Sequence, residues 1–441
     1  MSSIATNAGV VSFEEARRIV EEHAAGVLAG RGAGIAETVE LPAARGRVLA
    51  EEILADRDFP PFHRAARDGY AVRVADVQQV PARLEVVGEI KAGDTRQSGN
   101  GALTIKPGQA ASIMTGAPLP DGADAVVMVE HTRELPGTGR FVEVQQSVKR
   151  GENFVPRGSE GRAGQVVAEP GRRVNHALIA IAAAVGKSRV RVFQKPRVAV
   201  LSTGDEVVEV DAIPGPVQIR NSNSYSVAAQ IEEAGGEAVR LPVAPDEPVR
   251  LRELILEGLS CDLLLLTGGV SMGKYDLVER VLSELKAEFY FTGAKIQPGK
   301  PIVFGRCGAE TFGGTDRFSA AGARNRVSAP HYFFGLPGNP VSTMVTFRLF
   351  AQPMVEALAG ARPEPLIFLK ARLKSEVCTK TGLTRFLPAA LSGQAENTEV
   401  ERAPWQGSGD IAALAYANCY LVIPPDRERI EAGEWVSVLL P

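Results

Sequence analysis

The sequence predicts a multi-domain protein that combines a three-layer α/β domain with β-rich domains. Between residues 197 and 267, apolar runs alternate with helical patterns, which is typical of a parallel sheet covered by helices. Residues 60–156 instead alternate short β-like runs with Gly, Pro and Asp turns. After Pro363, apolar residues alternate with polar or charged ones. The α/β domain is therefore expected between a β-rich module and a C-terminal β domain.

Length, charge and cysteine content limit the class of protein. The 441 residues suggest about three domains, with ample chain to bury several cores. With 49 basic and 52 acidic side chains, the net charge of -3 gives no overall field that would attract nucleic acid or an anionic membrane. No export signal and no apolar span long enough to cross a bilayer occurs. The four cysteines show neither zinc-ligand spacing nor a dense disulfide framework, so we expect a cytoplasmic protein.

The first predicted helix starts at Ser12, where Ser-Phe-Glu-Glu resembles a capped start, and runs to a glycine-rich break at residues 30–34. In the β-rich module, residues 84–90 and 125–129 are the clearest strands. Residues 175–185 then predict a second helix. The chain is thus expected to pass through the β-rich module before the α/β domain begins.

The α/β domain is predicted to begin with a strand at residues 197–203. Helices at 224–234 and 248–259 then alternate with strands at 238–243 and 262–267. After the last of these strands, five apolar residues fall on one face of a helix: Leu277, Val278, Val281, Leu282 and Leu285. The loop between that strand and helix therefore lies at the carboxyl ends of the strands, where parallel sheets bind ligands.

Three glycine-containing turns predict an anion pocket. They are Thr267-Gly268-Gly269-Val270-Ser271-Met272-Gly273, Gln297-Pro298-Gly299-Lys300-Pro301 and Gly335-Leu336-Pro337-Gly338-Asn339-Pro340-Val341-Ser342. Consecutive glycines let backbone N–H groups converge on oxyanions, and Lys300 adds a compact cation. Each turn alone is explained as well by chain punctuation, but three together favour an anion site. No Walker A loop and no dinucleotide fingerprint occurs, which argues against kinase-like and Rossmann dehydrogenase functions.

Four carboxylates are candidates for chemistry at these turns: Asp68, Glu206, Asp246 and Asp276. Asp246 and Asp276 stand where helices start, so helix capping explains them equally well, and Asp68 before a glycine fits an ordinary turn. Glu206 follows a buried strand at its carboxyl end. Carboxylates beside phosphate-binding turns are what Mg²⁺ requires, with water completing its octahedron. The five histidines show no zinc-ligand spacing.

The order of several motifs resembles the MoeA family of molybdopterin molybdenumtransferases, which is related to the catalytic domain of gephyrin. The resemblance extends over nearly the whole chain. It rests on Pro60-Pro61-Phe62, Asp68-Gly69-Tyr70-Ala71-Val72, Met114-Thr115-Gly116-Ala117-Pro118-Leu119-Pro120, Ser202-Thr203-Gly204-Asp205-Glu206, Gly268-Gly269-Val270-Ser271, Pro298-Gly299-Lys300-Pro301 and Leu336-Pro337-Gly338-Asn339-Pro340-Val341-Ser342. Each motif alone is weak, but their order is highly specific.

This resemblance implies an elongated four-domain subunit with a MogA/MoaB-like three-layer α/β domain and a C-terminal domain like a β-barrel. The implied domains are a discontinuous dimerisation domain at 12–59 and 157–194, the inserted β-rich module at 60–156, the α/β domain at 195–362 and the C-terminal domain at 363–441. The resemblance also implies a homodimer. Its active cleft would lie between the α/β and C-terminal domains of one subunit and the β-rich module of the other.

The resemblance further implies a reaction between adenylylated molybdopterin and molybdate. Molybdenum enters the dithiolene of the pterin, the pyrophosphate link is cleaved and AMP is released, with Mg²⁺ assisting. Contact with the adenylyltransferase of the same pathway is expected as well. The glycine turns suit the phosphates, the carboxylates suit the cation and Lys300 suits an oxyanion.

Position by position, the resemblance implies a role for each candidate residue. The catalytic candidates are Asp68, Thr115, Glu206, Asp276 and Lys300. The substrate-binding candidates are Gly268, Gly269, Val270, Ser271, Asp246, Pro301, Arg385 and Ser408. The expected Mg²⁺ ligands are Glu206, Asp246 and Asp276. Arg385 and Ser408 are expected to complete the molybdate site from the C-terminal domain, although a turn arginine and a loop serine without function fit the same short segments.

Three departures from the family pattern limit this transfer. Arg67 stands where many relatives carry methionine before the Asp-Gly-Tyr turn, and it adds a cation there. Gln297 replaces a lysine, which removes a charge but keeps a hydrogen-bond donor. Residues 305–329 are longer than the family norm, and we interpret them as a solvated insertion without a catalytic role; the alternative is a lid or a partner surface formed by Arg306, Arg317, Arg324 and Arg326.

The sequence leaves other functions to be tested. A gephyrin-like scaffold would bind partners without turnover, and a molybdopterin adenylyltransferase or an amidase-type protein would share the α/β domain. The intact carboxylates and Lys300 argue against a purely structural protein, and the flanking domains argue against the two related enzymes. Tungstate is an alternative to molybdate because the two are nearly isosteric dianions.

Overall fold

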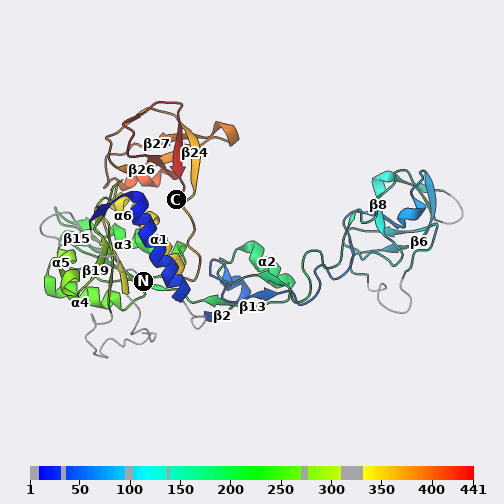
Figure 1. Ribbon diagram of the computed structural model, residues 1–441, viewed down its shortest axis with the longest axis horizontal. Helices are drawn as coiled ribbons and strands as arrows, with labels where there is room; N and C mark the ends of the chain where they lie inside the picture. The colour runs from blue at the N-terminus through cyan, green and yellow to red at the C-terminus, as the bar shows by residue number, and fades with distance from the viewer. Residues whose placement is uncertain (1–8, 31–35, 95–102, 137–139, 270–276, 309–330) are drawn as a thin grey trace.

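The computed structural model describes residues 9–30, 36–94, 103–136, 140–269, 277–308 and 331–441. The molecule is elongated, with the α/β and C-terminal domains at one end and the β-rich module at the other (Figure 1). A smaller domain that contains α2 (His176–Ala184) lies between them. The predicted multi-domain class, with α/β and β domains in one elongated chain, is confirmed.

A six-stranded sheet forms the β-rich module. Its strands are β5 (Gly69–Val72), β6 (Ala82–Ile90), β7 (Gln109–Ile113), β8 (Ala125–Met128), β9 (Thr132–Leu135) and β10 (Phe141–Val144). They lie in the order β8-β5-β7-β6-β10-β9, and only the β6–β7 pair is parallel. Successive residues of β5 alternate between two cores, with Tyr70 and Val72 in one and Ala71 in the other. Both faces of this sheet are therefore covered.

The middle domain is formed by chain segments on both sides of the β-rich module. β2 (Ala36–Glu40) pairs with β13 (Arg189–Phe193), and β3 (Ile53–Leu54) pairs with β12 (Val166–Ala168), both antiparallel. Helix α2 starts here because Oδ1 of Asn175 accepts a hydrogen bond from the N–H of Leu178 at 2.9 Å. The chain thus leaves this domain to build the β-rich module and then returns to it.

The α/β domain holds a six-stranded sheet in the order β17-β14-β18-β23-β22-β19. The parallel strands are β14 (Arg197–Ser202), β17 (Glu237–Arg240), β18 (Leu263–Thr267) and β23 (His331–Leu336). β19 (Glu288–Phe291) and β22 (Val303–Cys307) are antiparallel to their neighbours. The strands that the sequence predicted are parallel as expected, whereas this antiparallel edge was not predicted; its strands β19 and β22 pair without a helical crossover.

Helices cover both faces of this sheet and give the three predicted layers. On one side lie α3 (Ser222–Glu233), α6 (Pro340–Thr346), the π-helical turn Phe347–Ala351 and α7 (Gln352–Leu358). On the other side lie α4 (Pro248–Leu259) and α5 (Leu277–Glu284). The central strand β18 is buried along its whole length, with Leu263 and Leu265 in the first core and Leu264 and Leu266 in the second. An uninterrupted leucine run is what a strand between two helical layers requires.

Helix α1 (Phe13–Gly30) lies on the α/β domain (Figure 1). Its buried residues Ala16, Ile19, Val20 and Ala24 share a core with α3, α6 and α7. The preceding strand β1 (Val10–Val11) pairs with β20 (Gly293–Ala294) of the same domain. The sequence grouped this helix with residues 12–59, yet by its packing it belongs with the α/β core.

The C-terminal domain is a closed barrel of five strands. They are β24 (Phe368–Leu373), β26 (Thr384–Ser392), β27 (Glu399–Arg402), β28 (Cys419–Ile423) and β30 (Trp435–Leu439). The order β26-β27-β24-β30-β28 closes because β28 also pairs with β26. A sixth strand, β21 (Ile296–Gln297), comes from the α/β domain and pairs with the start of β26. This pairing joins the two domains.

The expected insertion begins later than the sequence indicated. Residues 305–307 complete β22, where Gly305 pairs with Phe333 and leaves no room for a side chain, since a Cβ would lie 2.5 Å from the Phe333 ring. Arg306 forms an ion pair with Glu288 at 2.6 Å on the neighbouring strand. Residues 309–329 lie outside the described residues.

Candidate active site

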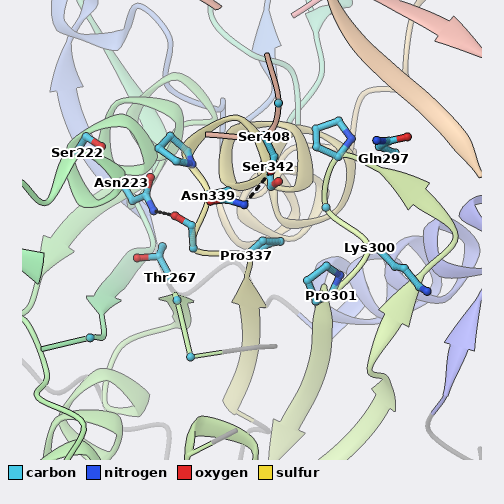
Figure 2. A pocket seen from close by; sticks show the side chains of 18 of the residues that line it. Ser222, Asn223, Thr267, Gln297, Lys300, Pro301, Pro337, Asn339, Ser342 and Ser408 are labelled. Carbon is cyan, nitrogen blue, oxygen red and sulfur yellow. Dashed lines mark hydrogen bonds between the residues drawn. The ribbon is translucent and has the colours of Figure 1, made fainter. Parts of the chain in front are cut away.

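A pocket of about 1210 Å³ opens at the carboxyl ends of the parallel strands. Residues that follow β14, β18 and β23 form one wall, and residues 380–385 and 405–408 of the barrel contribute to the opposite side. Residues from all three predicted glycine turns line it, as Figure 2 shows around Thr267, Pro301 and Pro337. The structure therefore brings together turns that are up to 70 residues apart in the sequence.

The first turn has glycines where no other residue fits. Gly268 and Gly269 have φ angles of +88° and +63°, which favour glycine. A Cβ on Gly269 would lie 2.7 Å from Cγ2 of Val278 and 2.8 Å from Oγ1 of Thr203. A Cβ on Gly338, in the third turn, would lie 3.3 Å from Cα of Gly268. Backbone conformation and close packing of the turns both require glycine here.

Two asparagines fix the third turn. Nδ2 of Asn223 donates to the carbonyl of Gly338 at 2.7 Å, and Nδ2 of Asn339 donates to Oγ of Ser408 at 2.8 Å (Figure 2). The N–H of Val341 also donates to the carbonyl of Ser408 at 3.1 Å. Ser408 thus ties the barrel to the third turn. Sequence reasoning selected Ser408 and missed both asparagines; the N-cap of α3 is Asn221, so capping gave no signal for Asn223 inside the helix.

Glu206 and Asp246 lie on the α/β side of the pocket. Oδ1 of Asp205 accepts a hydrogen bond from the N–H of Asp246 at 3.0 Å. Burial, and then the negative charges of Asp205 and Glu206, raise the pKa of Asp246 above its ordinary value. Helix α4 begins with Glu247 at its N-cap position and without a side-chain cap, so the capping interpretation of Asp246 is wrong.

Lys300, Pro301 and Arg385 line the same pocket. In the second turn, Gly299 has a φ of +105°, and a Cβ there would lie 2.3 Å from Cγ2 of Thr346. Arg385 extends from β26 of the barrel and is only 6% exposed. Its Nε–H donates to Oε1 of Gln297 at 2.8 Å, and burial lowers the pKa of its guanidinium. Carboxylates and cations are therefore both available to one bound ligand.

Asp68 and Thr115 contact each other but not this pocket. Oδ1 of Asp68 accepts from the backbone N–H of Thr115 at 2.6 Å and from its Oγ1 at 2.7 Å. These bonds lower the pKa of Asp68. Both residues, and the exposed Arg67, flank strands of the β-rich module, which lies at the far end of the molecule (Figure 1). Within one chain, these residues are remote from the glycine turns.

Three further candidates, Val270, Ser271 and Asp276, lie outside the residues that the structure describes. In the described part of the chain, no group of three or more His, Cys, Asp or Glu residues is arranged to hold a metal ion. No helix in the same part is both long and apolar enough to span a bilayer. Glu206 and Asp246 are thus the only two of the three expected Mg²⁺ ligands whose surroundings can be described.

Three family models match successive parts of the chain. The MoeA N-terminal region (domain I and II) matches residues 11–186, a probable molybdopterin binding domain matches 199–357, and the MoeA C-terminal region (domain IV) matches 370–440. The chain is also 35% identical over 410 residues to a molybdopterin molybdenumtransferase from Nostoc sp., covering 91% of this chain and 88% of that protein. The chain belongs to the MoeA family.

Solved structures of MoeA proteins agree with this assignment. A molybdopterin biosynthesis MoeA protein from Pyrococcus horikoshii is 28% identical with a TM-score of 0.74, covering 98% of this chain and 100% of that one. Another structure described in the same way is 31% identical with a TM-score of 0.68, covering 98% and 99%. MoeA membership assigns this chain a role in molybdenum cofactor biosynthesis.

Proposed function

We propose that the protein is a molybdopterin molybdenumtransferase that inserts molybdenum from molybdate into adenylylated molybdopterin and releases AMP. The supporting observation is a single pocket with two chemically different sides. Glu206 and Asp246 line it from the α/β domain, whereas Arg385 and Ser408 line it from the barrel. Its volume of about 1210 Å³ exceeds the usual range for ligand pockets of roughly 300–1,000 Å³, which leaves room for a nucleotide-linked pterin.

The phosphates of the substrate would bind at the interlocked first and third turns. Gly268, Gly269 and Gly338 line the pocket there without side chains, so a pyrophosphate can approach the backbone closely, although the N–H of Gly268 already donates to the carbonyl of Leu336 at 3.2 Å. The bonds from Asn223 and Asn339 hold the third turn before substrate arrives. A preformed site of this kind stabilises charge that develops when the pyrophosphate link breaks and AMP leaves.

Mg²⁺ fits the carboxylate side. Burial, and then the negative charges of Asp205 and Glu206, raise the pKa of Asp246, and a divalent cation would relieve the part of this effect that comes from charge repulsion. Protein sites usually give Mg²⁺ one or two carboxylates and leave its other positions to substrate phosphates and water. Glu206 and Asp246 would therefore hold it, with Asp276 as the third candidate. A bound ion would neutralise the pyrophosphate charge.

The oxyanion would bind on the barrel side, between Lys300, Arg385 and Ser408. The two cations attract a dianion, and the Ser408 hydroxyl is available as a polar contact at the same wall. Lys300 belongs to the α/β domain and Arg385 to the barrel, so the pairing of the two domains brings both cations to one pocket. Molybdate and tungstate are both tetrahedral dianions, and the experiment below compares them directly.

A homodimer is part of the same proposal. Asp68 and Thr115 are remote from the pocket of their own chain, so a second copy would have to deliver them. Their short mutual hydrogen bonds keep Asp68 ionised and oriented, which suits a group that contacts a substrate or cation. We also expect the pathway's adenylyltransferase to contact the open pocket and pass its product on.

The test is AMP release from adenylylated molybdopterin by the purified full-length chain, with and without molybdate and Mg²⁺ and with tungstate in place of molybdate, together with an assay for the metallated pterin. The proposal expects AMP release that depends on both additions and is matched by metal insertion. A folded dimer without release would favour a scaffold. Adenylylation of molybdopterin from ATP would favour the adenylyltransferase, and faster turnover with tungstate would change the assigned oxyanion.

A further inference from the structure

Gln297 and Arg385 meet where the α/β domain joins the barrel. β21 pairs in parallel with the start of β26, and Gln297 stands directly beside Arg385 in that register. The Nε–H of Arg385 donates to Oε1 of Gln297 at 2.8 Å, and Nη1 donates to the carbonyl of Leu383 at 3.2 Å. Both side chains line the large pocket. The guanidinium is therefore held at two of its three nitrogens.

Arg385 is a buried cation without a charged partner among the described residues. It is 6% exposed, and burial is the only cause of its lowered pKa, with no neighbouring carboxylate contributing. A guanidinium has five N–H donors, of which the bonds to Gln297 and Leu383 use two. The remaining donors are available to a ligand. Buried charges in proteins are normally paired, so an anion in the pocket would supply the charged partner that Arg385 lacks among the described residues.

We propose that Gln297 is a positioning residue that orients the Arg385 guanidinium toward a tetrahedral oxyanion dianion while leaving its positive charge uncompensated. The inference rests on the proposed function, because it assigns the oxyanion end of the same pocket. The neutral amide oxygen of Gln297 holds the planar guanidinium of Arg385 in one orientation through its bond with Nε. A guanidinium that is already oriented loses less conformational freedom when the dianion binds. The dianion then completes the charge pair.

The chemistry of position 297 explains why glutamine suits it. A carboxylate would also accept from Nε, but it would neutralise Arg385 and repel the dianion. A lysine would add charge, yet it has no acceptor and would repel the guanidinium. A methionine would fill a similar volume without accepting a hydrogen bond. Glutamine alone among these four combines an acceptor with a neutral side chain.

The test measures molybdate binding by isothermal titration calorimetry for the full-length chain and for Gln297→Met and Gln297→Glu. Gln297→Met should weaken binding about tenfold because one orienting hydrogen bond is lost. Gln297→Glu should weaken it by about a hundredfold because the cation is neutralised. AMP affinity should change by less than about twofold in both, since the nucleotide turns are not altered. The matched control is Gln394→Glu, an exposed glutamine in the same barrel.

A second arm separates positioning from domain docking. Gln297→Glu keeps the acceptor, so it should retain thermal stability while it loses molybdate affinity. In an Arg385→Lys background, Gln297→Met should have no further effect on molybdate binding, because its action passes through the guanidinium. If Gln297→Glu binds molybdate as tightly as the wild type, the inference about Gln297 is wrong. It is also wrong if Gln297→Met weakens molybdate binding equally in the wild-type and Arg385→Lys backgrounds. Neither result contradicts the proposed function. Failure of the unmodified chain to bind molybdate or tungstate overturns the proposed function as well.

Discussion

At the residue scale, Asp246 stands where charge destabilises the fold. Its pKa is raised by burial and by the charges of Asp205 and Glu206, so ionising this carboxyl group is less favourable in the folded chain than in the unfolded chain. When the pKa of a carboxyl group is higher in the folded chain than in the unfolded chain, the folded state loses stability as the pH rises. The loss begins near the unfolded-state pKa of about 3.9 and is complete above the folded-state pKa. An ionised Asp246 therefore lowers the stability of the folded state, and side chains with perturbed pKa values of this kind are typical of functional sites.

Asp246→Asn should accordingly raise the melting temperature at pH 7 and lower turnover by more than about tenfold. The gain in melting temperature should shrink as pH falls toward about 4, because the wild-type carboxyl is then protonated as well. Mg²⁺ should stabilise the wild type by mass action and the variant much less. Differential scanning fluorimetry at several pH values, with and without Mg²⁺, measures all three effects. Equal stabilisation of both proteins by Mg²⁺ would remove Asp246 from the cation site.

Gly204 leaves space for the carboxylate of Glu206. It has a φ of +130°, and a Cβ there would lie 2.5 Å from Oε2 of Glu206. Gly204→Ala should therefore displace the Glu206 carboxylate and reduce turnover by about a hundredfold. Gly186→Ala is the matched control, because Gly186 has a φ of +81° and open space around it. The control should lose only about 1 kcal/mol of stability and keep full activity in the AMP-release assay. Similar activity of the two variants would contradict a role for the placement of Glu206.

At the scale of elements, a buried arginine joins helix α1 to the π-helical turn Phe347–Ala351. Arg17 is 7% exposed, and its Nη1 donates to the carbonyl of Leu349 at 2.6 Å. Its Nε donates to Glu21 at 2.6 Å one turn later in α1. A π-helical turn changes the usual hydrogen-bond spacing, and a side chain from another helix satisfies one of its carbonyls. α1 thus supports the helical segment that follows the third glycine turn.

Arg17→Met should leave the Leu349 carbonyl unpaired and lower the local free energy of unfolding by about 1–3 kcal/mol. The neighbouring exposed residue provides the control, since Arg18 pairs only with Glu15 and Glu22 on the helix surface. Arg18→Met should cost less than about 0.5 kcal/mol. Native-state hydrogen exchange of the α1 amides reports both values. Equal protection of α1 in the two variants would show that the contact with Leu349 adds nothing to stability.

At the scale of the whole molecule, the proposed chemistry is divided between distant domains. Asp68 and Thr115 lie in the β-rich module, and the glycine turns lie in the α/β domain at the other end of an elongated chain (Figure 1). In a twofold-symmetric dimer, a residue of one copy contacts a different residue of the other copy and the reverse contact occurs as well, so each of two sites can combine the module of one chain with the pocket of the other. This division can be tested without a structure of the dimer.

Asp68→Asn and Glu206→Gln should each be inactive alone, because every site then lacks one group. After the two variants are mixed, unfolded and refolded together, half of the dimers are mixed and carry one intact site. Activity should then recover to about a quarter of the wild-type level. The AMP-release assay measures the recovery, and size-exclusion chromatography confirms the dimer. Mixtures that stay inactive despite forming dimers would place both groups in one chain.

The same three scales separate what the sequence predicted from what it did not. The buried strand Leu263–Thr267 was predicted because a continuous apolar run has a single stable placement, between two helical layers. The antiparallel edge of that sheet was not predicted, because the sequences of strands β19 and β22 do not indicate in which direction each strand runs. The turns were predicted from glycine and proline. The hydrogen bonds from Asn223 and Asn339 were not predicted, since their acceptors are 115 and 69 residues away in the chain.

The sequence by itself determined the domain classes, the three glycine turns, the family resemblance and most candidate residues, because each of these depends on local pattern and motif order. Only the tertiary structure decided that Glu206, Asp246, Lys300, Arg385 and Ser408 line one pocket while Asp68 and Thr115 do not. It also decided that Arg385 contacts Gln297, through a strand pairing between two domains. Such long-range contacts depend on packing and register, which local sequence does not encode.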